Sequence, residues 1–271
     1  MHPKMFRLTG AKKETLTLLA EFFCLRTNDL VQIRHSEQKE SYRRSMRRTL
    51  QLLAGEKLVN RLPYLDLNLE RGGITYAYGL SDKGVNVMRD AGFIKQIKSF
   101  DQHSQRTLDH ELEISFFHVA LKDFCNRNEL TLFWQQKDLK CTVNPDAYFA
   151  ITDPKRPEGK NTLHYFLEVE RAKIGSWKNG EPQILRKLGK YYSYFNTTGC
   201  EKEWGNFRQF RVIVVQRTDE KREFLLSKLA EKYKHRMFWL TAEQHYKNDI
   251  GATIFKTPRD FQSASYSFVD A

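Results

Sequence analysis

The stretch from Asn144 to Tyr194 decides the fold of this chain. It opens as NPDAYFAI, continues after a polar segment as HYFLEVERA, and reaches RKLGKYYSY. Two short apolar runs around a polar loop predict two strands, and the later basic and aromatic segment predicts a helix. Side chains two residues apart on a strand point to the same face, so we expect Glu168 and Glu170 to project together. Asp146, on the neighbouring strand, can join them.

Three carboxylates on one face repel one another unless a positive charge lies between them. A divalent cation, Mg²⁺ or Mn²⁺, prefers such hard oxygen ligands. The chain has 45 Lys and Arg against 33 Asp and Glu, a formal net charge of +12, and a pI of about 9.5. A surface this basic favours polyanions, so a phosphodiester is the substrate that we expect for such a metal.

The cysteines and the hydropathy pattern indicate the compartment. The four cysteines lie far apart in the sequence and form no C-x-x-C pair, which is typical of reduced thiols in a cytoplasmic protein. No run reaches the roughly 18 apolar residues that a membrane span needs, and the N-terminus lacks the apolar core of a signal peptide. We therefore expect a cytoplasmic protein without a membrane span.

The first module, residues 1–95, holds most of the basic excess. Apolar spacing predicts helices over 14–25, 29–33 and 41–54. A strand over 57–62, a Gly72-Gly73 turn, a strand over 74–78 and a last helix after Leu80 follow. Together with the segments GEKLVNR before the turn and YGLSDKG after it, this order resembles a winged helix-turn-helix, which implies DNA binding.

In that resemblance the third helix is the recognition helix. It carries four arginines spaced to form a basic stripe, Arg43, Arg44, Arg47 and Arg48, while its apolar residues face the other side. Arg71, at the tip of the wing, can reach a phosphate or the minor groove. The alternative is a solvated basic face on a protein-interaction domain.

The second module is predicted to begin after a linker over 96–106 and to run over 107–250, with a polar tail over 251–271. A long helix opens at Asp109-His110-Glu111. Strands are predicted over 131–135, 146–151, 165–171, 210–216 and 237–241, and helices over 183–194 and 220–234. The tail is either disordered or a docking segment for a coupling partner.

This order, with Pro145-Asp146 and Glu168-Val169-Glu170, resembles the restriction-endonuclease-like fold of the PD-(D/E)xK nucleases. The resemblance implies an α+β or α/β domain around a mixed sheet. One position departs from it, because Glu170 stands where those nucleases have a lysine. Lys187 is the best substitute from elsewhere in the chain, and Lys190 is second. In the alternative, Glu170 pairs with Arg171 or a lysine and the site is inactive.

Taken together, the two modules resemble the replication-relaxation family, which includes the MOBC-class plasmid relaxases, over roughly residues 10–245. The resemblance assigns catalytic positions to His110, Lys187 and Tyr191 beside the three acids. It places Lys190 among the DNA contacts. Glu111 or Glu113 could supply a further metal ligand.

The resemblance implies a relaxase that binds double-stranded DNA at a transfer origin and nicks one strand, with accessory and coupling proteins of a relaxosome as partners. The attacking group is water or a tyrosine, with Tyr191, Tyr192 and Tyr194 near enough to be considered. Two other functions stay open. One is a non-catalytic DNA-binding regulator or relaxosome accessory protein with a degenerate nuclease fold, and the other is a restriction or repair endonuclease.

Overall fold

The computed structural model describes residues 10–35, 39–66, 73–92, 99–100, 105–136, 139, 141–171, 177–178, 181–204, 207 and 209–268. The chain divides into two compact units, Met1–Val119 and Ala120–Ala271. The boundary falls within helix α5, Gln105–Arg127, rather than in the segment 96–106 that the sequence suggested as a linker. Phe100, in that segment, is fully buried.

The first unit is a helical bundle with a small antiparallel sheet. Its three strands pair in the order β1-β3-β2, and β2 and β3 are paired antiparallel from Val59 opposite Leu80 to Asp66 opposite Gly73. Its elements are α1 Gly10–Phe22, β1 Leu25–Arg26, α2 Thr27–Arg34, α3 Glu40–Gly55, β2 Val59–Asp66, β3 Gly73–Leu80 and α4 Asp82–Asp90. The helices and the hairpin occur in the predicted order.

Three helix boundaries differ from the prediction by three residues or more. Helix α1 begins at Gly10, four residues before the predicted start at Glu14. Helix α1 ends at Phe22 and not at Leu25, because Phe23 adopts a positive φ of 65°, which breaks the helix and turns Leu25 into β1. Helix α5 begins at Gln105, four residues before the predicted start at Asp109. Its first turn is polar and therefore gives no periodic apolar signal.

The second unit is built on a five-stranded mixed sheet in the order β10-β9-β6-β5-β4. The pairs β4–β5 and β5–β6 are antiparallel, whereas β6–β9 and β9–β10 are parallel. Parallel neighbours need a crossover, which helices provide here. The elements are β4 Thr131–Gln136, β5 Ala147–Thr152, β6 Thr162–Glu170, β7 Trp177–Lys178, β8 Glu181–Pro182, α6 Gln183–Asn196, α7 Gly199–Trp204, β9 Arg211–Gln216, α8 Asp219–Lys232, β10 Phe238–Ala242 and α9 Glu243–Asp249.

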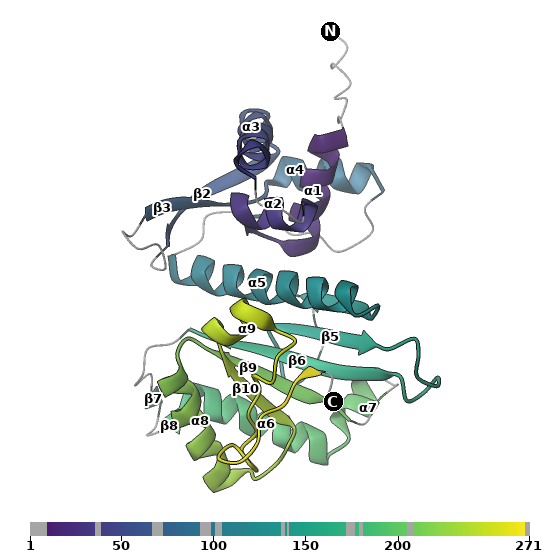
Figure 1. Cartoon of the computed structure of the whole chain (residues 1–271), viewed down its shortest axis with the longest axis vertical. Helices are drawn as coiled ribbons and strands as arrows, with labels where there is room; N and C mark the ends of the chain where they lie inside the picture. Colours follow the sequence, from purple (N-terminus) through teal and green to yellow (C-terminus); the bar gives the residue numbers. More distant parts are fainter. Residues whose placement is uncertain are drawn as a thin grey trace. The chain divides into compact units, whose positions relative to one another are not determined.

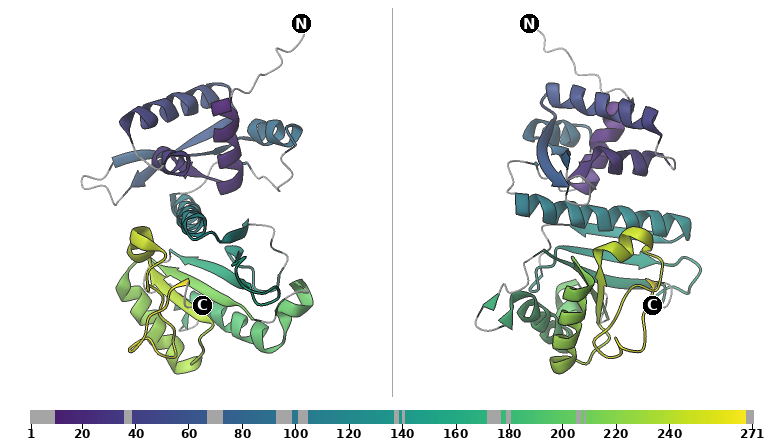
Figure 2. Two further views of the ribbon diagram at one scale, coloured as in Figure 1. Left: turned by 45° about the vertical axis from the view of Figure 1, so that its right-hand side comes forward. Right: turned by 60° about the vertical axis from the view of Figure 1, so that its left-hand side comes forward.

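Helices α6 and α8 cover one face of this sheet (Figures 1 and 2). Leu188 and Tyr191 of α6 pack there in one core with Phe166, Val212 and Val214 of the central strands. Both faces of β6 are buried from Tyr165 to Val169, as expected for a central strand. Glu168 therefore projects into the layer between β6 and α6.

The opposite face of the sheet is closed by the end of the chain. The ring of Phe268 lies 5.4 Å from that of Tyr165 and 4.8 Å from that of Phe255, and it also contacts Phe124 of α5. Upstream, Lys256 and Leu240 exchange two backbone hydrogen bonds beside β10. The described part of the segment 251–271, predicted as a polar tail, is thus packed on the sheet.

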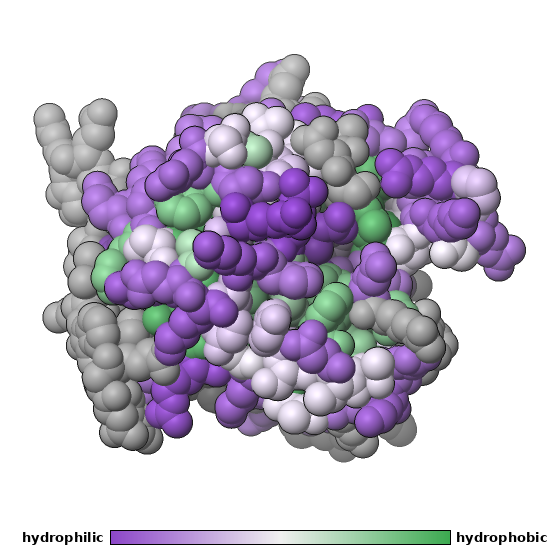
Figure 3. All heavy atoms as spheres, turned by 90° about the horizontal axis from the view of Figure 1, so that it is seen from below, coloured by the Kyte–Doolittle hydropathy of each residue, from purple (hydrophilic) through white to green (hydrophobic). Residues whose placement is uncertain are grey.

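No helix among the described residues is long and apolar enough to cross a membrane. On the face of the molecule that Figure 3 shows, hydrophilic side chains form a broad central area, and apolar residues form separate smaller areas. The cysteines Cys24, Cys125, Cys141 and Cys200 are all free thiols.

His164 on β6 makes the stability of the protein sensitive to acid. Its ring stacks on Phe207 at 3.8 Å, and its Nδ1 shares a 2.8 Å hydrogen bond with the hydroxyl of Tyr148. Burial lowers the pKa of His164 to about 4. Because the folded-state pKa lies below the unfolded value, stability is full above about pH 6.5 and falls as the pH drops toward 4.

We expect His164→Gln, which does not titrate, to flatten this acid dependence. The Tm of the wild type, measured by circular dichroism, should fall more steeply between pH 6.5 and 4 than that of the variant. Parallel curves for the two proteins would show that His164 does not take up a proton on unfolding.

Candidate active site

The site lies where β5 begins and β6 ends. Asp146 directly precedes β5, and its backbone NH donates to the carbonyl of Leu167 at 3.0 Å. Its side chain accepts a 2.7 Å hydrogen bond from the backbone NH of Val169 through Oδ2. These two contacts fix Asp146 beside Glu168, which is only 2% exposed.

Lys187 on α6 joins the two carboxylates. Its Nζ lies 2.5 Å from Oε2 of Glu168 and 3.9 Å from Oδ1 of Asp146. Lys187 is on the side of α6 that faces the sheet, which is why a residue distant in sequence reaches both acids. With 31% of its side chain exposed, Lys187 is the most accessible of the three.

The carboxylates and the ammonium shift one another's protonation. Burial, and secondly the charge of Asp146, raise the pKa of Glu168 to about 8, while Lys187 and the hydroxyl of Tyr191 oppose the shift. Burial is also the largest influence on Lys187 and favours the neutral amine, but the charges of Glu168 and Asp146 together raise its pKa. Lys187 is therefore a stable cation in the site.

Tyr191 lies one turn after Lys187 on α6 and contacts Glu168. It is fully buried, and its hydroxyl donates a 2.5 Å hydrogen bond to Oε1 of Glu168. Burial and the adjacent Glu168 raise the pKa of Tyr191 well above its usual value. A phenol that is buried and keeps its proton is a poor nucleophile, so the geometry favours a positioning role for Tyr191.

The other two tyrosines on α6 are engaged elsewhere. The hydroxyl of Tyr194 donates to Glu203 at 2.8 Å, and the ring of Tyr192 packs on that of Tyr233 at 4.8 Å. Water is therefore better suited than any of the three α6 tyrosines to attack a substrate.

Glu170 lies at the end of β6, where it pairs in register with Gln216 of β9. Arg171, the next residue, forms an ion pair with Glu243 at the start of α9. Burial, the largest influence, lowers the pKa of Lys221, and the charge of Glu170 opposes this shift. The charge of Glu170 also makes a small contribution to the raised pKa of Lys187.

Gln216 and Lys221 are near this edge of the sheet and are not among the residues predicted from the sequence. Gln216 is 3% exposed, and its Nε2 has no hydrogen-bond partner among the described residues, which is costly for a buried donor. Burial is the main cause that lowers the pKa of Lys221. The only signal for Gln216 in the sequence was a polar residue that ends the apolar run RVIVVQ.

Within the described part of the chain, no group of three or more His, Cys, Asp or Glu side chains is arranged to hold a metal ion. Asp146 and Glu168 nevertheless converge on one cation, the ammonium of Lys187. Two carboxylates suit Mg²⁺ or Mn²⁺, because Mg²⁺ commonly takes its remaining ligands from water and substrate phosphates. The donor set therefore fits a metal that binds together with its substrate.

Comparison with known proteins identifies the family. Residues 16–209 match the family described as Replication-relaxation. The chain belongs to the Replication-relaxation family. Its matched range includes Asp146, Glu168, Lys187 and Tyr191, whereas Gln216 lies beyond it.

Other comparisons add little to this assignment. No curated protein matches this member of the Replication-relaxation family. The solved structure of the restriction endonuclease FokI aligns with 96% of this chain and 71% of its own, at 8% identity. Its TM-score of 0.32 is too low to establish a shared fold.

His110, Glu111 and Glu113 lie on α5 in the first unit, whereas the carboxylates of the candidate site belong to the second unit. His110 is in the second turn of α5 and not at its start. Glu113 is 2% exposed, and Glu111 is partly buried. The catalytic role of His110 and the metal-binding roles of Glu111 and Glu113 stay predictions.

Helix α3 presents the arginine stripe to solvent. Arg44, Arg47 and Arg48 are exposed, whereas Met46, Leu50 and Leu53 are buried as predicted. Glu40, at the first position of α3, forms ion pairs with Arg43 at 3.6 Å and with Arg47 at 3.2 Å. Such exposed pairs contribute little to stability. Arg71 lies outside the described residues.

Proposed function

We propose that this member of the Replication-relaxation family is a DNA relaxase of plasmid mobilisation, of the MOBC class, that makes a metal-dependent nick in one strand at a transfer origin. The observation that carries the proposal is the ammonium of Lys187 held between Asp146 and Glu168 in a strongly basic chain. The second unit then acts as a PD-(D/E)xK-like nuclease module. Relaxosome accessory and coupling proteins are its expected partners, in the cytoplasm.

The first unit supplies the duplex contacts in this proposal. Its three helices followed by an antiparallel hairpin suit a winged helix-turn-helix, with α3 as the recognition helix. The exposed arginines of α3, together with Arg71, bind phosphates or base edges. Lys190, exposed on α6, contributes a phosphate contact in the second unit.

The reaction is hydrolysis of one phosphodiester bond. A water oxygen forms a new bond to phosphorus, the bond from phosphorus to the leaving deoxyribose oxygen breaks, and that oxygen gains a proton as the attacking water loses one. Asp146 and Glu168 would hold a divalent ion, which would supply positive charge to the phosphate and lower the pKa of a bound water. Lys187 stabilises the negative charge that develops on the phosphoryl oxygens.

The remaining side chains orient the participants. Glu170 orients the attacking water or takes part in metal binding, and Tyr191 holds the Glu168 carboxylate in place.

A nicking assay tests the function directly. The protein is incubated with a supercoiled plasmid that carries its transfer origin, in Mg²⁺, in Mn²⁺ and in EDTA. We expect open circles that require both the origin and the metal, because a relaxase cuts one strand at one site. Linear product, or nicks on plasmid without the origin, would instead indicate a restriction or repair endonuclease.

One observation favours a second candidate, a DNA-binding regulator or relaxosome accessory protein with an inactive nuclease fold. No three-ligand metal group occurs among the described residues, and the ammonium of Lys187 already lies between Asp146 and Glu168. A gel shift on origin DNA without nicking in any metal, even with accessory proteins added, would support this candidate.

A further inference from the structure

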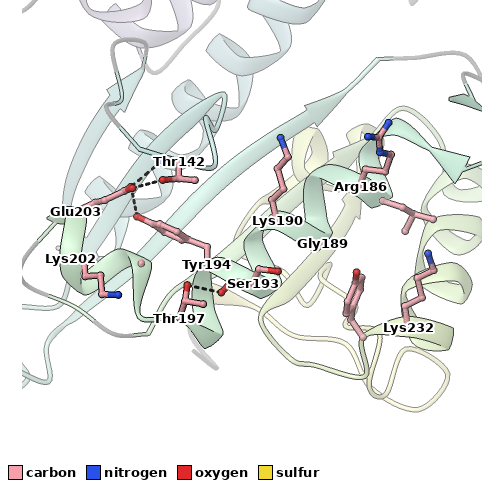
Figure 4. A pocket seen from close by; sticks show the side chains of 13 residues that line it. Thr142, Arg186, Gly189, Lys190, Ser193, Tyr194, Thr197, Lys202, Glu203 and Lys232 are labelled. Atoms are coloured by element: carbon pink, nitrogen blue, oxygen red, sulfur yellow. Dashed lines mark hydrogen bonds between the residues drawn. The ribbon is translucent and has the colours of Figure 1, made fainter. Parts of the chain in front are cut away.

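A basic pocket lies on the side of α6 away from the carboxylates. It has a volume of about 790 Å³ and is formed by α6, α7, the end of α8 and the segment before β5 (Figure 4). Four cationic side chains line it, and all four residues are exposed: Arg186, Lys190, Lys202 and Lys232. These cations come from three helices that are separate in the sequence, so the pocket is a product of the fold.

One carboxylate, Glu203, lines the pocket beside these cations, and neutral donors bind it. It accepts hydrogen bonds from the backbone NH and the hydroxyl of Thr142 and from the hydroxyl of Tyr194. Although burial opposes it, these hydrogen bonds lower the pKa of Glu203, which is therefore ionised. Among the residues that line the pocket, four are cationic and one is a carboxylate, so the lining carries an excess of positive charge that suits an anionic ligand.

The cations are spread along the pocket and do not converge on one point. In Figure 4, Lys232 and Arg186 lie at one end, Lys190 in the middle, and Lys202 near Glu203 at the other. A single phosphate would meet only part of this set. Successive phosphates of an extended strand would meet all of it, and each neutralised phosphate releases bound counterions.

Helix α6 connects the pocket with the active site. Lys187 points to the carboxylates, while its neighbours Arg186 and Lys190 point into the pocket. Lys187 and Lys190 are separated by roughly 4.5 Å along the helix axis, from the rise of an α-helix. A strand whose phosphate is at Lys187 can therefore continue across α6.

We propose that this pocket binds the backbone phosphates of the DNA strand that flanks the scissile phosphate. This inference rests on the proposed function, because the pocket would hold the DNA strand that the active site cuts. The contacts are to phosphates and therefore carry no sequence preference. The hydroxyls of Ser193 and Thr197 on the same wall are further neutral groups beside the strand.

The test measures binding without cleavage. A short fluorescent single-stranded oligonucleotide is titrated in EDTA by anisotropy at several salt concentrations, with the wild type, Lys190→Gln/Lys202→Gln and the control Lys228→Gln. Lys228 lies on α8 outside the pocket and pairs with Glu231. We expect the double variant to bind about tenfold more weakly, and its salt slope to fall by about 1.4, at about 0.7 per lost contact.

An unchanged Kd and salt slope in the double variant would overturn the inference, as would equal losses in Lys228→Gln. A second experiment measures the binding of inorganic phosphate alone. Saturable binding of phosphate alone, abolished in the double variant while oligonucleotide binding is unaffected, would identify a small-anion site and also overturn it. If the wild type fails to nick but the double variant loses oligonucleotide binding, the proposed function fails and the strand site stands.

Discussion

Replacing Glu168 by Gln is expected to lower the rate of nicking by about a thousandfold or more, equivalent to about 4 kcal/mol of activation free energy. The amide keeps the shape of the side chain and can still accept the hydrogen bond from Tyr191. It removes the negative charge that, in the proposal, holds the divalent ion and the ammonium of Lys187. The rate of open-circle formation in Mn²⁺ measures the effect.

The same variant separates catalysis from folding. Because burial raises the folded-state pKa of Glu168 to about 8, its contribution to stability is full below about pH 4.5 and is lost as the pH rises through 8. In EDTA, Glu168→Gln should therefore have a Tm that rises relative to the wild type as the pH increases from 5 to 9. Glu231→Gln, an exposed matched control, should match the wild type in both assays. Wild-type nicking by Glu168→Gln would remove this carboxylate from the mechanism.

Replacing Lys187 by Met is expected to lower kcat by about a hundredfold to a thousandfold, the range seen when one preorganised donor to a transition state is lost. KM for DNA should change little, because the charge on the transferred phosphoryl group develops in the transition state. Single-turnover kinetics on a labelled origin duplex measure the effect.

Lys187→Met also leaves two acids without their shared cation, so we expect its Tm to fall by several degrees. Lys187→Arg, which keeps the charge, should recover most of the stability and part of the rate. Lys228→Met, on the exposed side of α8, is the matched control. Equal loss of rate in Lys187→Met and Lys228→Met would show that the effect is a general loss of charge.

The sequence predicted those parts of the site that depend on local pattern. The apolar runs around Asp146 and Glu168 predicted β5 and β6, because alternation within a strand places side chains on one face without reference to the rest of the fold. The choice of Lys187 depends instead on the resemblance to the nuclease fold, in which the helix after these strands packs beside them. The structure brings its ammonium to both acids. Each of these inferences spans fewer than about fifty residues, the length of the segment Asn144–Tyr194.

The sequence could not predict what depends on long-range pairing. Glu168 and Glu170 look alike in the alternation, yet one is buried under α6 and hydrogen-bonded to Tyr191, whereas the other ends the strand beside Gln216. That difference follows from where α6 crosses the sheet. The partnership of Glu170 with Gln216 requires the strand order β9-β6, which no local pattern specifies.

The boundaries of two helices could not be predicted for a different reason. The start of α5 at Gln105 lies in a polar segment, where apolar spacing gives no information. The end of α1 depends on the positive φ of Phe23, a conformation that is uncommon for an aromatic residue and that the sequence did not indicate.

The packing of Phe268 has a consequence for the shortest useful fragment of the second unit. A polypeptide stopped at residue 250, where the nuclease-like module was predicted to end, would lack Phe255 and Phe268. The rings of Phe149, Tyr165 and Trp239 on that side of the sheet would then face water. An exposed aromatic surface of this kind promotes aggregation. Truncations meant to isolate the second unit should therefore extend through Phe268.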